Sequence, residues 1–232
     1  MRETPMRLNA GPDTACGRRV RRLRVVSVVA FAIFGALAAA VGAGLSVPGD
    51  RPIYVFLSGY DDSAIGGVAD FLASRGIEVV GAATIAAILL ALVMARRIWL
   101  AALLAASFLP LLVRPALRIT PGLTGLFDRQ QPPSVHPLAD WTFPSGHATG
   151  SMAIAAVAVI VAWPSRWRER LLLAASFFVP AVGLAAVIGG HHWPSDVVAG
   201  WSLTLGWVTA LYSLAPDRFA AFHARGERSW EH

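Results

Sequence analysis

The chain has 232 residues, a length that would suit one or two soluble domains. Hydrophobic residues make up 56% of it and charged residues only 15%, whereas a soluble domain typically carries about 25% charged residues, so the composition excludes a water-soluble globule and a disordered chain. The formal net charge is +6, all 20 basic residues are arginine, and Cys16 is the one cysteine. These counts exclude lysine chemistry, an intramolecular disulfide and a cysteine-built zinc site.

Six apolar stretches follow one another along the chain, and a helix that crosses a bilayer needs roughly 20 such residues. The apolar runs are continuous rather than alternating, which indicates helices and not barrel strands. We therefore predict an all-α fold, a bundle of six transmembrane helices. Its predicted spans are residues 25–47, 77–95, 98–113, 147–163, 171–189 and 197–214. A cleaved signal peptide is the alternative for the first stretch, which is longer than the usual signal core of about 7–15 residues.

The arginines predict the orientation of the bundle. Fifteen of the 20 lie in the tail 1–24, in the connections at 96–97 and 164–170, and in the tail 215–232. By the positive-inside rule both tails are cytoplasmic, and the membrane domain 25–214 exposes external loops at about 48–76, 114–146 and 190–196. A basic tail next to a span is typical of contact with anionic lipids, so we expect no nucleic-acid partner.

The first external loop is predicted to contain a short helix. Asp62 or Ser63 would cap its start and Gly76 would end it. One face would carry four apolar residues, Ile65, Val68, Phe71 and Leu72. Two interpretations remain open, namely a helix lying in the membrane interface and a segment packed over the bundle.

The second external loop ends in the motif Pro144-Ser145-Gly146-His147, directly before an apolar stretch. A proline, a small hydroxyl residue and a glycine at this place predict a helix N-terminus with free backbone N–H groups, which attracts anions. Ser145 would donate a further hydrogen bond, Gly146 would let the anion approach the backbone, and His147 would act as an acid or base. The alternative is an ordinary capped helix with an interfacial histidine.

The third external loop contains His192 and Asp196, four residues apart. If a helix begins near Pro194, Asp196 can hold one imidazole nitrogen and raise the basicity of the other. The competing interpretation is a metal site formed by His147, His191, His192 and Asp196. Two adjacent histidines on one short turn rarely point at the same ion, so we expect no metal and no other cofactor. The remaining candidates, His136 and His223, have no comparable surroundings in the sequence.

The predicted topology places both reactive loops on the external side of the membrane. Two histidines, one aspartate and a helix N-terminus would then meet at the level of the lipid head groups. These parts suit phosphoryl transfer through a histidine, in which one imidazole attacks phosphorus and the other protonates the leaving oxygen.

Over about residues 77–214 the chain resembles the type-2 phosphatidic acid phosphatase superfamily, a group of integral-membrane lipid phosphate phosphatases related to soluble vanadium haloperoxidases. The motif at 144–147, His192, Asp196 and the run Val197-Val198-Ala199-Gly200 carry the resemblance. It implies that His192 is the nucleophile that forms a phosphohistidine and that Asp196 orients it. It also implies that His147 protonates the leaving group and then activates water, that Ser145 and Gly146 hold phosphate oxygens, and that no metal is needed.

The chain departs from this family at three positions where the pattern has a phosphate-binding lysine or arginine. These positions hold Thr124, Gln131 and Ala186. Three arginines of the second external loop are the candidate replacements, because arginine can grip phosphate with two nitrogens: Arg114, Arg118 and Arg129. Snorkelling at the end of the third span is the other interpretation for the first of them.

The sequence therefore predicts a bacterial plasma-membrane phosphatase with a periplasmic or extracellular active site. Its substrate would be a lipid phosphate or a polyprenyl diphosphate in the outer leaflet. The alternative from another class is a catalytically silent family member that binds lipids or acts as a scaffold. A transferase of lipid head groups that uses the same histidine is a third possibility.

Overall fold

The computed structural model describes residues 15–73, 75–120, 127, 129–130, 132–133, 143–162 and 167–214. Within these residues every regular element is a helix. Several predictions lie outside the described residues: those on the ends 1–14 and 215–232, on Thr124, Gln131, His136 and His223, and on the side chains of Arg114 and Arg118.

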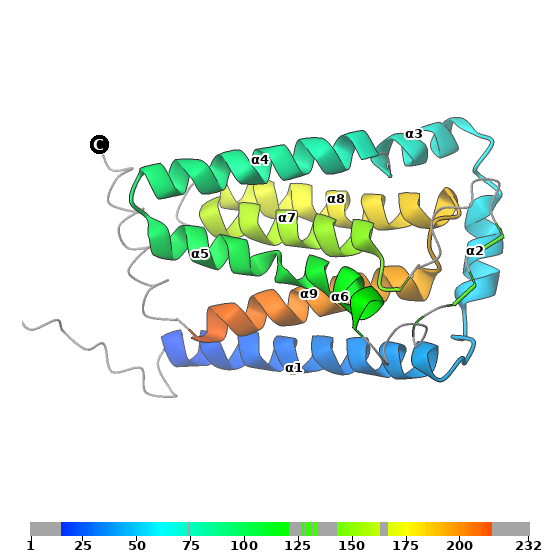
Figure 1. The fold of residues 1–232 in the computed structure, drawn as a ribbon, viewed down its shortest axis with the longest axis horizontal. Helices are drawn as coiled ribbons and strands as arrows, with labels where there is room; N and C mark the ends of the chain where they lie inside the picture. Colours follow the sequence, from blue (N-terminus) through cyan, green and yellow to red (C-terminus); the bar gives the residue numbers. More distant parts are fainter. Residues whose placement is uncertain are drawn as a thin grey trace, which may run out of the picture.

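The long helices run alongside one another as an up-and-down bundle (Figure 1). Their bounds are α1 Ala15–Gly42, α4 Arg75–Met94, α5 Ile98–Ser107, α7 Gly146–Ala162, α8 Arg168–Ile188 and α9 Pro194–Leu214. Each lies within a few residues of a predicted span, except that α1 begins ten residues before position 25, so that it includes the arginine-rich segment. The all-helical prediction is confirmed for the described part of the chain.

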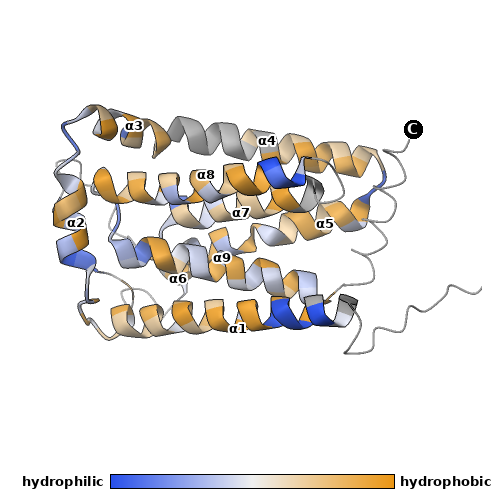
Figure 2. Cartoon of the chain, turned by 180° about the vertical axis from the view of Figure 1, so that it is seen from behind, coloured by the Kyte–Doolittle hydropathy of each residue, from blue (hydrophilic) through white to orange (hydrophobic). Residues whose placement is uncertain are grey.

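Three of the described helical segments are long and apolar enough to cross a membrane, and they are Val20–Gly42, Arg168–Ile188 and Pro194–Leu214. A bent pair of helices would make a fourth span. Apolar side chains such as Val28, Leu90 and Phe177 are exposed on the outside of the bundle. Figure 2 shows hydrophobic residues along most of the long helices and hydrophilic ones at the N-terminal end of α1. A count of six spans stays a prediction.

The third predicted span, at 98–113, is broken in the structure, and whether it crosses the membrane stays a prediction. Helix α5 ends at Ser107, and a 3-10 turn η1 (Leu109–Leu112) and a short helix α6 (Val113–Ile119) follow. The chain bends by 44° between Ile98–Ser107 and Leu109–Leu117. Pro110 lies in the 3-10 turn, and a proline has no backbone N–H and disfavours the helical conformation of the residue before it. The break therefore follows from the proline.

The first external loop forms two helices, α2 (Asp50–Ser58) and α3 (Ala64–Leu72). Helix α2, which the sequence analysis did not predict, lies across one end of the bundle (Figure 1). The Ser63 side chain caps α3 by accepting hydrogen bonds from the backbone of the first turn, as one of the two predicted alternatives required. The predicted end of α3 at Gly76 is wrong, because α3 ends at Leu72 and α4, whose apolar run extends back over Gly76, has already begun.

Helix α9 packs against α1 on one side and α7 on the other. Gly200 makes the second contact possible, since a Cβ at this position would lie 2.7 Å from the Ser145 carbonyl oxygen and 2.9 Å from Thr149 Oγ1. The absent side chain thus brings the start of α7 close to the start of α9. These two starts carry the candidate site.

Candidate active site

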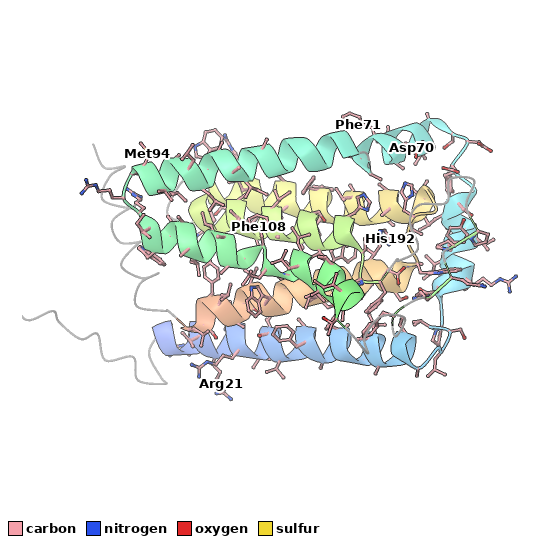
Figure 3. All side chains as sticks on the ribbon, in the orientation of Figure 1. Arg21, Asp70, Phe71, Met94, Phe108 and His192 are labelled. Atoms are coloured by element: carbon pink, nitrogen blue, oxygen red, sulfur yellow. The ribbon has the colours of Figure 1, made fainter. Side chains whose placement is uncertain are left out.

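His192 lies in the turn between α8 and α9, at the end of the bundle that α2 covers, whereas Arg21 and Met94 lie at the opposite end (Figure 3). Gly190 has a φ of +69°, a backbone conformation that glycine adopts without strain and that commonly ends a helix. The turn is closed by the Ala186 carbonyl, which accepts hydrogen bonds from the backbone N–H groups of His191 at 3.0 Å and His192 at 3.1 Å. Local chain reversal therefore positions the buried His192 side chain.

His147 lies in the first turn of α7 and meets His192 directly. Nδ1 of His147 is 3.4 Å from Nε2 of His192, and the ring centroids are 5.5 Å apart with the planes at 69°. The sequence places these residues 45 positions apart, and the structure brings them together as predicted. A hydrogen bond between the two facing nitrogens requires a proton on one of them and a lone pair on the other.

A backbone carbonyl determines which nitrogen of His147 carries a proton. Nε2 of His147 is 3.2 Å from the carbonyl oxygen of Ala73, the residue that ends α3. Because a carbonyl oxygen can only accept, Nε2 must be the donor, and Nδ1 is left to face His192. The sequence contains no signal for this contact, since a backbone carbonyl looks the same at every residue.

Asp196 is fully buried in the first turn of α9. Its Oδ2 accepts the backbone N–H of Trp193 at 2.9 Å and lies 3.9 Å from Nδ1 of His192. The second distance allows an ionic interaction but exceeds a hydrogen bond. The carboxylate thus faces Nδ1 of His192, as an orienting residue would, but the distance between the two atoms is slightly longer than a hydrogen bond.

The predicted anion site at the start of α7 contains a helix cap. Ser145 Oγ accepts the backbone N–H of Ala148 at 3.3 Å, and the backbone N–H of Ser145 donates to the Asp196 carbonyl at 3.0 Å. Ser145 is fully buried, while Gly146 is partly exposed. The cap joins the starts of α7 and α9, and phosphate binding by Ser145 and Gly146 stays a prediction.

Of the other residues in the alternative metal site, His191 stacks on His147 with centroids 6.1 Å apart and an interplanar angle of 21°. Within the described residues no three histidine, cysteine, aspartate or glutamate side chains are arranged to hold a metal ion.

Arg129 lies between two buried carboxylates. Its Nη2 donates to Asp50 Oδ2 at 2.7 Å, and its Nη1 donates to Asp196 Oδ1 at 3.0 Å and to Ser195 Oγ at 2.8 Å. Asp50, the first residue of α2, is the site residue that the sequence analysis missed. The only signal was an acidic residue before an apolar run, which is too common to distinguish a site residue from a surface residue.

The segment around Arg129 is fastened to the bundle by two aromatic residues. Trp193 Nε1 donates to the Gln130 carbonyl at 2.8 Å, and the Tyr54 hydroxyl donates to the Pro133 carbonyl. The two rings meet edge to face with centroids 5.4 Å apart. Burial, and then the nearby Asp61 carboxylate, raise the pKa of the Tyr54 hydroxyl above its usual value, so the hydroxyl stays protonated and donates.

The model of the PAP2 superfamily matches residues 25–220 of this chain, which is most of its length. The chain belongs to the PAP2 superfamily. This confirms the resemblance seen in the motifs around His147 and His192. No curated protein sequence matches the chain.

The fold of this PAP2 chain is shared with a solved structure. A crystal structure of a transmembrane PAP2-type phosphatidylglycerolphosphate phosphatase from Bacillus subtilis matches it with a TM-score of 0.61. The two sequences are 20% identical, and the match covers 81% of this chain and 94% of the other. Together with the apolar helices, the match identifies the PAP2 chain as an integral membrane protein.

Three positions depart from the family pattern, and Ala186 is the one among the described residues. It supplies no cation. Ala186 is fully buried, and its carbonyl holds the turn that carries His192. Arg114 and Arg118 lie four residues apart on α6, a spacing that places both on one face of a helix. Arg129 is the candidate replacement whose side chain the structure describes, and carboxylates surround it.

Proposed function

We propose that this PAP2 protein is a membrane phosphatase that hydrolyses a lipid phosphate or diphosphate through a phosphohistidine on His192. The meeting of His147 and His192 supports this function, because the transfer needs an attacking group and an acid in the same small site, on either side of the phosphate. The helix N-terminus at Gly146 lies next to the pair and favours an anion.

The surroundings of His192 indicate which of its nitrogens attacks. Nδ1 faces the Asp196 carboxylate, so the proton of the neutral imidazole belongs on Nδ1, and Nε2 holds the lone pair. Nε2 would form a bond to phosphorus while the bond between phosphorus and the leaving oxygen breaks. The lipid alcohol, or the lipid monophosphate when the substrate is a diphosphate, would leave.

His147 would enter the reaction protonated on both nitrogens, so that its Nε2–H donates to the Ala73 carbonyl and its Nδ1–H supplies the proton for the leaving oxygen. In an in-line displacement the leaving oxygen lies opposite the attacking nitrogen, so the phosphate must enter between two rings whose nitrogens are now 3.4 Å apart. In the second half, Nδ1 of His147 would take a proton from water as the water attacks phosphorus. Inorganic phosphate and free His192 result.

The phosphate group of the substrate carries about two negative charges, which the site must offset. We assign this role to the amides at the start of α7, to Ser145 and Gly146, and to Arg114 and Arg118 on α6. No metal or other cofactor is part of the proposal.

The site lies at the end of the bundle opposite the arginine-rich start of α1 (Figure 3). If arginines mark the cytoplasmic side, the site opens at the outer surface of a bacterial plasma membrane, where a lipid phosphate or a polyprenyl diphosphate presents its head group. Surrounding membrane lipids would be the other partners of the protein.

The test is phosphate release by the purified protein from phosphatidic acid, phosphatidylglycerol phosphate and a polyprenyl diphosphate. We expect release from at least one of them and none from a His192→Ala variant. The buried Ala186, where the family pattern has an arginine, favours a second candidate, a catalytically silent lipid-binding member. If the parent protein releases no more phosphate than His192→Ala from every substrate, the catalytically silent alternative is favoured.

A further inference from the structure

Asp50 is a buried carboxylate that has no part in the reaction as proposed. Its Oδ1 accepts the backbone N–H of Ser195 at 2.8 Å, and its Oδ2 accepts the Ser195 hydroxyl at 2.6 Å and Arg129 Nη2 at 2.7 Å. Asp50 therefore binds the first turn of α9 from outside the helix, at the end where the helix dipole favours a negative charge. A buried carboxylate with every contact satisfied indicates a defined role.

Arg129 connects Asp50 to the candidate site. The guanidinium spans from Asp50 to Asp196, lies 5.4 Å from the centre of the Trp193 ring, and has a side chain that is 16% exposed. Each of its two terminal nitrogens donates to a buried carboxylate. A phosphate would have to break one of these ion pairs to gain Arg129, and a buried charge that loses its partner is strongly unfavourable.

Asp196 uses its two oxygens for different partners. Oδ1 accepts from Arg129, and Oδ2 accepts from Trp193 and faces His192. The arginine thus fixes the rotation of the carboxylate. Because Asp50 shares the charge of Arg129, Asp196 keeps part of its own negative charge for His192.

We propose that Asp50 is a positioning residue of the site. It holds Arg129 on Asp196, and Arg129 acts on the reaction through Asp196 rather than as a ligand of the phosphate. This inference rests on the proposed phosphatase function. It changes the role expected for Arg129 from the sequence and leaves Arg114 and Arg118 as the candidate cationic ligands.

The experiment compares Asp50→Asn, Arg129→Gln and the double variant in kcat, KM and inhibition by inorganic phosphate. We expect each single variant to lose about 10- to 100-fold in kcat, the scale of misplacing a catalytic group by a fraction of an ångström to one ångström. KM and the inhibition constant of phosphate should stay within about threefold, because neither residue touches the phosphate. The double variant should be no slower than the slower single one, since both changes break the same unit.

Two controls match the charge changes. Asp62→Asn and Arg51→Gln alter exposed residues of the first external loop, which also contains Asp50. Both variants should keep the kcat of the parent protein. The melting temperature separates positioning from folding. The double variant should be more stable than Arg129→Gln, which leaves two buried carboxylates without their cation, and yet remain as slow.

Three results would overturn the inference. They are a kcat of Asp50→Asn equal to that of Asp62→Asn, a rise of about tenfold or more in KM or in the phosphate inhibition constant of Arg129→Gln, and losses that multiply in the double variant. If Asp50→Asn does not fold, Arg129→Gln and the double variant still decide the matter. A parent protein no more active than His192→Ala would refute the proposed function and this inference together, whereas an active parent with an unaffected Asp50→Asn refutes only the inference.

Discussion

His147 contacts two groups that are distant in the sequence. His192 is 45 positions away and Ala73 is 74 positions away. The carbonyl of Ala73 holds one proton of the imidazole, so the other nitrogen alone is available for transfer. The chemistry proposed for His147 therefore depends on where α3 ends.

Replacement of His147 by alanine should affect substrates differently according to their leaving group. A lipid alcohol is a poor leaving group and needs the proton, so its hydrolysis by His147→Ala should fall by about 10²–10⁴-fold. An aryl phosphate leaves without protonation, and its hydrolysis should fall much less. Rates of phosphate release from both substrates give the comparison, with His192→Ala as the control that abolishes both. Equal losses on the two substrates would exclude His147 as the general acid.

Arg114 and Arg118 are the remaining candidates for gripping the phosphate. Arg114→Gln or Arg118→Gln should lower kcat/KM by about 10²-fold, the scale of losing one oriented donor. The exposed Arg51, changed to glutamine, serves as the matched control. If both substitutions leave kcat/KM within about threefold of the parent, the phosphate rests on Ser145, the α7 amides and the histidines without an arginine.

Helix α3 presents different faces to the bundle and to its surroundings. Gly66 and Ala69 are buried, and Ala69 packs against Ala185 and Ile188 of α8. Three large apolar side chains of α3 point away from the bundle, with Ile65 53%, Val68 59% and Phe71 65% exposed. Leu72, which was predicted on the same face, packs against the bundle instead. The packing over the bundle that one interpretation predicted is therefore present, and a place of the outward face in the membrane interface stays a prediction. The outward face is typical of a helix in contact with lipid.

A spin label at position 68 tests where this face lies. In a Val68→Cys variant without Cys16, reconstituted in bilayers, the label should be more accessible to oxygen, which dissolves in lipid, than to a water-soluble nickel complex. A label at position 62, in the polar turn before α3, should show the opposite preference. A water-like accessibility at position 68 would place α3 above the membrane instead of in it.

At the scale of the whole molecule, the bundle has two chemically different ends. The candidate site and α2 lie at one end, and Arg21, Arg96 and Arg97 belong to the other, where α1 begins and α4 turns into α5 (Figures 1 and 3). Arginine is retained on the cytoplasmic side of membrane proteins. The difference between the ends therefore predicts an external site.

Cysteine labelling in intact cells tests this orientation. With Cys16 removed, a cysteine at Asp62 should react with a thiol reagent that does not cross the membrane, whereas a cysteine at Arg97 should react only after lysis. Both side chains are exposed, so reactivity reports the side of the membrane and not burial. The reverse pattern would place the active site in the cytoplasm.

The sequence alone determined the helices and the main reactive groups. A helix that crosses a bilayer must be long and apolar and satisfies its own backbone hydrogen bonds, so the apolar runs marked most of the long helices within a few residues. The third stretch also contains Pro110, the residue at which the structure breaks the helix. His147, His192 and Asp196 stood out because polar residues at the ends of apolar helices are few and chemically distinctive.

Only the tertiary structure decided which groups meet at the site. Asp50, Arg129 and Asp196 form one network, although 79 positions separate the first from the second and 67 separate the second from the third. No local pattern encodes such a contact, because it arises from the way α2 crosses the end of the bundle and from the close approach that Gly200 allows between α7 and α9. The same holds for the Ala73 carbonyl, since a backbone group gains its specific role only from its place in the fold.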